Sequence, residues 1–154
     1  MKYEASDWDP LSAGKETRYY EFVYMACRTG LRLEELLGLC WGDVDFQNRF
    51  LSVNRAVSFV RETNEVIYEE PKSASSRRRI DLDAETCDFL SKMKDSLRFA
   101  LGSLDGDTPV FSNPDESPWK PGPVSSGVKK IMRSIGRSDA SLHSLRHSHA
   151  SALL

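Results

Sequence analysis

The sequence predicts a mainly α fold with a small three-stranded antiparallel sheet. Three observations lead to this fold class. Apolar residues recur with a helical period before residue 41 and again after residue 83. Between these regions the period changes to two, and two turn-forming stretches interrupt it. With 154 residues, of which 40% are hydrophobic, the chain can bury one core and form one domain.

Two helices are expected before the sheet, after a loose N-terminal segment at 1–15. The stretch from Glu16 to Arg28 leaves little polar face, which is typical of a helix buried nearly all round. Gly30 can end this helix in a left-handed cap. A second helix should follow, because apolar residues recur there at i, i+3, i+4 and i+7. These residues are Leu33, Leu36, Leu37 and Cys40.

Three strands forming a meander are expected in the middle of the chain. The first carries Leu51, Val53 and Val57 on one face, the second is Val66 to Tyr68, and the third is anchored by Ile80 and Leu82. The stretches "ETNE" at 62–65 and "PKSASSR" at 71–77 supply the two turns.

Helices are expected again after the sheet. Asp83 suits the N-cap of a long helix, with Cys87, Leu90, Leu97 and Leu101 turned inward. The stretch from Gly102 to Gly122 is rich in Gly, Pro, Asp and Ser and reads mostly as loop, with "PVF" at 109–111 extended. Pro123 suits the first position of the next helix, whose apolar stripe is Val124, Val128, Ile131 and Ile135. A last helix should begin near Leu142 or His143. The domain is therefore expected to span 16–154.

The charge balance argues against indiscriminate nucleic-acid binding, since the net charge is −2. Basic residues nevertheless concentrate between Lys120 and Arg146, whereas acidic ones gather at Glu62, Glu65, Glu69 and Glu70. One face can therefore contact phosphates while the whole chain stays slightly negative.

An acidic, polar start gives no signal peptide, and no apolar run is long enough to span a bilayer. Three cysteines in apolar helical patterns (Cys27, Cys40 and Cys87) suggest reduced, buried thiols. These features predict a cytoplasmic protein with no membrane partner.

All 3 histidines lie in "HSLRHSH" at 143–149. His143 and His147 are four residues apart, as zinc ligands on a helix often are. However, Ser144 stands where the metalloprotease pattern requires a glutamate base. We therefore expect no metal and no cofactor here. The alternative to a ligand-binding role is that these histidines are merely solvated or packed against other residues.

His143 and Arg146 would share one face of a helix, which suits a phosphate better than a metal. The guanidinium offers a bidentate fork and the imidazole one more donor. Arg32 is a second candidate, because it follows a glycine turn at the start of a helix, where free N–H groups favour an anion. Glu35, one turn on, either holds Arg32 in place or forms an ordinary surface pair.

The stretch "PKSASSRRR" at 71–79 is either a solvated hairpin tip or a flexible finger that brings Lys72 to a nucleic-acid backbone. Strand alternation turns Arg78 inward with Ile80, so Arg77 and Arg79 should face outward. The candidates for nucleic-acid contacts are Lys72, Arg77 and Arg79, together with Lys129, Lys130 and Arg133 further along.

Taken together, three motifs resemble the catalytic domain of tyrosine recombinases, the phage-integrase family. They are "TGLRLEEL" at 29–36, "PKSASSRRRIDL" at 71–82 and "HSLRHSHAS" at 143–151, and they match in order and spacing. "WGDVDFQNRFLSV" at 41–53 is similar to the family's lead into its sheet. The resemblance runs from about Tyr19 to the last residue. It implies the fold of the DNA breaking-rejoining enzymes and a phage or mobile-element origin.

The resemblance also implies a role for each residue. Arg32 and Arg146 match the family's two arginines, Glu35 the acidic residue that supports the first, Lys72 the hairpin lysine and His143 the first histidine. In the family, a tyrosine hydroxyl attacks a DNA phosphate and leaves a 3'-phosphotyrosyl link. The arginines and histidine neutralise the phosphate oxygens, and the lysine protonates the leaving oxygen. The implied partners are double-stranded DNA and, in the full-length protein, further copies of the chain on DNA.

The family's nucleophilic tyrosine should follow the last motif, yet all 5 tyrosines of this sequence precede His143. We therefore expect a catalytic domain that lacks its C-terminal end and the N-terminal DNA-binding domain, and that is inactive as it stands. Two alternatives remain. A type IB topoisomerase-like enzyme shares this chemistry, and a non-catalytic DNA-binding module could keep the phosphate clamp without the nucleophile.

Overall fold

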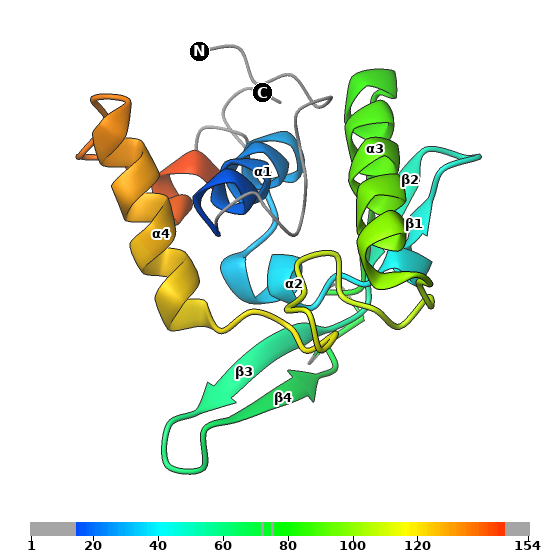
Figure 1. Ribbon diagram of the computed structural model, residues 1–154, viewed down its shortest axis with the longest axis horizontal. Coiled ribbons are helices and arrows are strands. Elements are labelled where there is room, and N and C mark those ends of the chain that lie inside the picture. The colour runs from blue at the N-terminus through cyan, green and yellow to red at the C-terminus, as the bar shows by residue number, and fades with distance from the viewer. Residues whose placement is uncertain (1–14, 72, 75, 147–154) are drawn as a thin grey trace.

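The computed structural model describes residues 15–71, 73–74 and 76–146 (Figure 1). It confirms the predicted fold class, because the domain is mainly helical with small antiparallel sheets beside the helices. The elements in chain order are α1 (Lys15–Thr29), α2 (Leu33–Leu37), β1 (Val44–Asp45), β2 (Phe50–Val53), β3 (Ala56–Val60), β4 (Glu65–Glu69), β5 (Arg78–Asp81), α3 (Ala84–Leu101) and α4 (Pro121–Ser134). A short 3-10 turn spans Trp41–Asp43, and residues 142–146 are helical as well.

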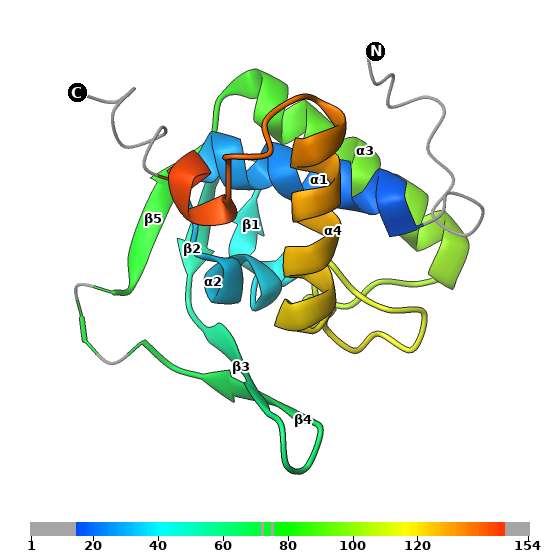
Figure 2. The same ribbon diagram turned by 90° about the vertical axis from the view of Figure 1, so that its left-hand side faces the viewer.

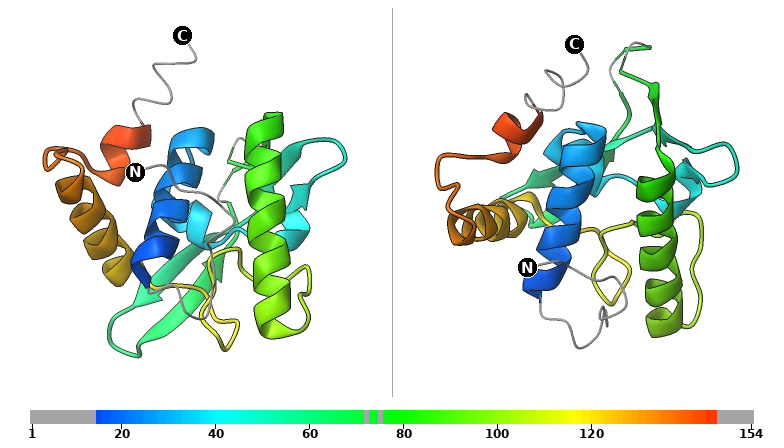
Figure 3. Two further views of the ribbon diagram at one scale, coloured as in Figure 1. Left: turned by 45° about the horizontal axis from the view of Figure 1, so that its top comes forward. Right: turned by 90° about the horizontal axis from the view of Figure 1, so that it is seen from above.

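Helix α1 lies at the centre of the molecule, between α3 and α4 (Figures 1 and 3). Phe22 and Met25 are fully buried, as the small polar face of this helix predicts. Tyr24 packs on Phe89 of α3, with ring centroids 4.0 Å apart. Even Arg18 is buried, and its guanidinium donates to the Ser112 carbonyl at 2.6 Å. The helix thus holds both flanks of the domain together.

Gly30 ends α1 as predicted. Its φ of 67° lies in the left-handed region, and its N–H donates to the Ala26 carbonyl at 3.0 Å. The second helix is shorter than expected, since α2 ends at Leu37 and Cys40 lies beyond it. The reason is Asp43, whose carboxylate accepts the Cys40 N–H at 2.9 Å and starts a new turn.

The predicted three-stranded meander is wrong in its connections. The expected first strand divides into β2 and β3, because Asp43 also binds Asn54 at 2.8 Å and Arg55 at 2.6 Å and turns the chain there. One sheet has the order β1-β2-β5, and β3 with β4 forms a separate hairpin. Strand β4, which contains Val66 to Tyr68, therefore pairs only with β3 among the described strands. Figure 2 shows this β3–β4 hairpin (residues 56–69) extending away from the helices.

The later helices follow the prediction with two corrections. Asp83 caps α3 by accepting the Thr86 N–H at 2.8 Å. Helix α4 begins at Pro121 rather than Pro123, because a proline is equally suited to the first position there. Ile135 lies just past the end of α4 and is exposed, so the buried stripe stops at Ile131 and Met132.

The cysteines differ from the expectation of three buried thiols. Cys40 is buried and Cys87 is half-buried, but Cys27 is exposed on α1. Burial raises the pKa of the Cys40 thiol. Within the described residues, no helix is both long and apolar enough to cross a membrane.

Replacing Gly30 by Ala tests the turn that ends α1. An L-residue at this φ is strained, so Gly30→Ala should lower the free energy of unfolding by about 1 kcal/mol. Urea unfolding followed by circular dichroism measures the change. Gly122→Ala is the matched control, because a Cβ there meets no atom within 4 Å. Equal stability of the two variants would contradict the role assigned to Gly30.

Candidate phosphate-binding site

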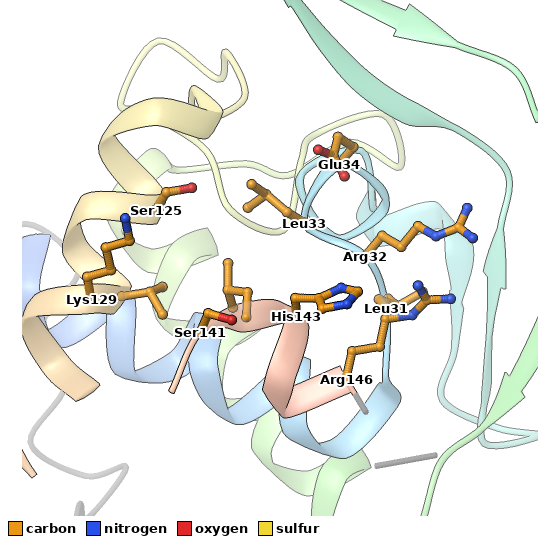
Figure 4. Close-up of a pocket in the computed structure, with 11 residues that line it drawn as sticks. Leu31, Arg32, Leu33, Glu34, Ser125, Lys129, Ser141, His143 and Arg146 are labelled. Carbon is orange, nitrogen blue, oxygen red and sulfur yellow. The ribbon is translucent and has the colours of Figure 1, made fainter. Parts of the chain in front are cut away.

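Arg32, His143 and Arg146 line one pocket of about 450 Å³ (Figure 4). Arg32 comes from the turn before α2, whereas His143 and Arg146 come from the helical turn at 142–146. Helix α4 closes the other side of the pocket with Ser125, Val128 and Lys129. The fold therefore brings together residues that are more than a hundred positions apart in the sequence, as their motifs predict.

Arg146 is held by the turn that ends α1. Its Nε–H donates to the Gly30 carbonyl at 3.2 Å, which fixes the guanidinium plane beside the Arg32 turn. The helical turn itself is capped by two serines. The Ser141 N–H donates to Ser144 Oγ at 2.6 Å, and the Ser144 N–H donates back to Ser141 Oγ at 3.3 Å. Sequence alone therefore places His143 and Arg146 on one face, and the Gly30 contact orients that face toward Arg32.

Arg32 is exposed, and its backbone rather than its side chain is anchored. The Arg32 N–H donates to Glu35 Oε2 at 3.0 Å, and the Arg32 carbonyl accepts the Leu36 N–H at 2.9 Å. The side chain is thus free to meet an anion in the pocket. Helix α2 has 5 residues, so its dipole adds little and the side chains must supply the positive charge.

Glu35 supports this turn in a way that the sequence did not predict. Its two carboxylate oxygens each accept one hydrogen bond from Arg78 of β5, both at 3.0 Å. The Glu35 side chain is only 8% exposed. Glu35 therefore contacts Arg32 through the Arg32 backbone N–H, and its bidentate ion pair is with Arg78. Arg78 could have been suspected, because an inward-facing arginine needs a carboxylate partner.

The pKa of Glu35 reflects these contacts. Burial raises the pKa, but the hydrogen bonds from Arg78 and from the Arg32 backbone lower it more, together with the positive charges of both arginines. The net pKa is below the ordinary glutamate value. Glu35 therefore stays ionised at neutral pH and keeps β5 fixed to the Arg32 turn.

The other predicted contact residues lie in different places. Lys72 is outside the described residues. Arg77 is exposed and pairs with Glu70 at 3.2 Å, and Arg79 stacks over the Phe50 ring at 4.3 Å. These two arginines are not in the pocket lining.

On α4, Lys129 lines the pocket. Lys130 and Arg133 are exposed on the same helix but do not contribute to the lining. The predicted group of three basic residues on this helix is therefore divided between the pocket and the outer surface.

The model of the phage integrase family matches residues 7–154, so this chain belongs to that family. The ICEBs1 integrase of Bacillus subtilis is 26% identical over 137 residues, which are 86% of this chain and 36% of the relative. A XerC-like tyrosine recombinase of Caldanaerobacter subterraneus is 28% identical over 153 residues, 90% of this chain and 39% of the relative. The chain thus spans well under half the length of either relative.

Solved structures share the fold. The Tn1549 transposon integrase, in complex with a circular intermediate DNA, superposes with a TM-score of 0.74 at 20% identity, covering 93% of this chain and 48% of that one. The XerA recombinase superposes with a TM-score of 0.67 at 22% identity, covering 93% and 45%. These similarities confirm the predicted tyrosine-recombinase catalytic fold.

Replacing Glu35 by Gln should destabilise the protein by about 2 kcal/mol at pH 7, because Arg78 then loses its charged partner while half-buried. The folded-state pKa of Glu35 is lowered, so its stabilising effect is complete above the ordinary pKa. The effect is lost as the pH falls through the folded-state value. The stability difference between wild type and Glu35→Gln should therefore shrink below about pH 4, as measured by urea unfolding at several pH values.

Glu34→Gln is the matched control, because Glu34 is the exposed neighbour on the same helix. Its effect should stay within about 0.5 kcal/mol. A Glu35→Gln effect that matches this control, or that does not change with pH, would show that the ion pair contributes nothing to the turn.

Proposed function

We propose that this chain is the catalytic domain of a site-specific tyrosine recombinase that integrates or excises a mobile element. The observation that carries the proposal is the convergence of Arg32, His143 and Arg146 on one pocket. Two guanidinium groups and an imidazole are suited to a phosphodiester, because they donate to its non-bridging oxygens. Family membership supports the same reading.

The proposed reaction is a phosphate transesterification. A tyrosine hydroxyl attacks the scissile phosphate, the bond to the 5'-oxygen breaks, and a 3'-phosphotyrosyl link forms. Arg32 and Arg146 neutralise charge that grows on the non-bridging oxygens, and His143 donates one more hydrogen bond. Glu35 acts through the Arg32 turn and not on the phosphate itself. Lys72 protonates the 5'-oxygen as it leaves, a role carried over from the family motif.

The proposed partner is double-stranded DNA. The DNA in the complex with the Tn1549 integrase supports this for the family. In the chain itself, the basic pocket lies between α2 and α4, whereas Glu62, Glu65, Glu69 and Glu70 are exposed on or next to the β3–β4 hairpin. Arg77, Arg79, Lys130 and Arg133 are proposed as further backbone contacts outside the pocket. The relatives are much longer than this chain. Self-association on DNA and action in the cytoplasm are therefore proposed for the whole protein rather than for these 154 residues alone.

A second candidate is a DNA-binding module that holds phosphates without cutting. The observation that favours it is that the described lining of the pocket supplies donors for a phosphate and contains no tyrosine. Both candidates require the same phosphate clamp and differ in the nucleophile.

The clamp is tested by replacing Arg32 and Arg146 with Ala together. Duplex binding by the wild type should weaken as salt rises, because phosphate contacts release counterions. The double variant should bind more weakly at low salt, with the slope of log K against log salt reduced by about two. Fluorescence anisotropy with a labelled duplex measures both.

The matched control replaces Arg61 and Arg98, which are exposed on the hairpin and on α3, away from the pocket. This variant should keep the wild-type slope. If both double variants bind equally well, or if wild-type binding does not respond to salt, the phosphate clamp is wrong.

Covalent chemistry provides a separate test. These 154 residues should form no adduct with a nicked suicide duplex, because the family's nucleophilic tyrosine has no counterpart after His143. Denaturing gel electrophoresis with labelled DNA detects such an adduct. A protein–DNA band that survives the detergent would mean that one of the upstream tyrosines is the nucleophile.

A further inference from the structure

The pocket extends beyond the three family residues to a second polar group on α4. Ser125 and Lys129 line it together with Arg32, His143 and Arg146. Figure 4 shows Arg32 and Arg146 at one end of the pocket and Ser125 with Lys129 at the other. The recombinase motifs account for the first end. At the second end, Lys129 is expected only as a general nucleic-acid contact, and Ser125 has no predicted role.

Ser125 and Lys129 are four residues apart and therefore share one face of α4. Val124 and Val128, beside them in the sequence, are 1% exposed, so the helix is fixed against the core and holds this face toward the pocket. Lys129 is itself exposed. Among the described residues, no carboxylate forms an ion pair with its ammonium group. The Lys129 charge is therefore available to a ligand.

The direction of a bound strand follows from the charges. Glu34 also lines the pocket, two residues after Arg32 on the α2 side, and its carboxylate would repel a second phosphate placed against that helix. The α4 side offers an ammonium group and a hydroxyl, both of which donate to phosphate oxygens. A DNA strand carries one negative charge per about 3.4 Å of helix axis. A strand with one phosphate at the arginines must therefore place the next one nearby.

We propose that Lys129 and Ser125 form a second phosphate subsite, which binds the phosphate next to the one held by Arg32 and Arg146 on the same strand. The ligand class is a phosphate–sugar–phosphate step. This inference rests on the proposed function, because the first phosphate is the one assigned to the arginine clamp. Lys129 fixes the register of the strand and takes no part in the chemistry.

Small nucleotides test the subsite without a duplex. Thymidine 3',5'-bisphosphate carries two phosphates separated by one sugar, and thymidine 5'-monophosphate carries one. The wild-type chain should prefer the bisphosphate by roughly tenfold, since a charge-assisted contact is gained. Lys129→Ala should abolish the preference, because bisphosphate affinity then falls to the level of the monophosphate, whereas Lys129→Arg should retain it. Ser125→Ala should lower the preference by about twofold to threefold. Calorimetric titration measures each affinity.

Two controls separate the possible failures. Lys92→Ala removes an exposed lysine of α3, outside the pocket, and should keep the preference. Thymidine 5'-diphosphate has both phosphates on one side of the sugar and should bind more weakly than the bisphosphate. If Lys129→Ala retains the preference while the Arg32 and Arg146 double variant loses monophosphate binding, the subsite is wrong and the clamp stands. If the double variant binds the monophosphate as the wild type does, the proposed function itself fails.

Discussion

Glu35 is a nearly buried carboxylate, and both of its oxygens must find donors because water cannot reach them freely. Its partners are the Arg78 guanidinium at the start of β5 and the Arg32 N–H at the start of α2. The Glu35 carboxylate therefore joins the turn that carries Arg32 to β5, the strand that follows Lys72 in the sequence. Leu36 and Leu37 of α2 are buried in the core, and the Glu35 contacts fix the start of the helix to β5, which keeps Arg32 at the wall of the pocket.

Much of the fold could be predicted from local patterns. The buried helix α1, its left-handed end at Gly30 and the Asp83 cap are each determined by residues within one or two turns. The division of the sheet could not be predicted in this way. It depends on Asp43, which binds Asn54 and Arg55 about ten residues away and breaks an apparently continuous strand. Alternation of apolar residues carries no information about such a side-chain anchor.

The candidate site was likewise predictable in part from local patterns and in part not. The residue types that suit a phosphate could be found from the motifs, because Arg32, His143 and Arg146 each follow a recognisable local signal. The contacts that orient them could not, since Gly30 and Arg78 act through a backbone carbonyl and a distant ion pair. Lys129 is similar: in the sequence it is one of several basic residues on a helix, and only the packing of Val124 and Val128 distinguishes it from Lys130.

The hydrogen bond from Arg146 to Gly30 closes a loop of 116 residues. Loops of this length cost entropy that nearby contacts must first offset, so such contacts form late as a chain folds. The core between α1, α3 and α4 has to assemble before the second arginine can reach its carbonyl. The proposed phosphate clamp should consequently be completed at the last stage of folding, so that partly folded chains would hold a phosphate more weakly than the native domain.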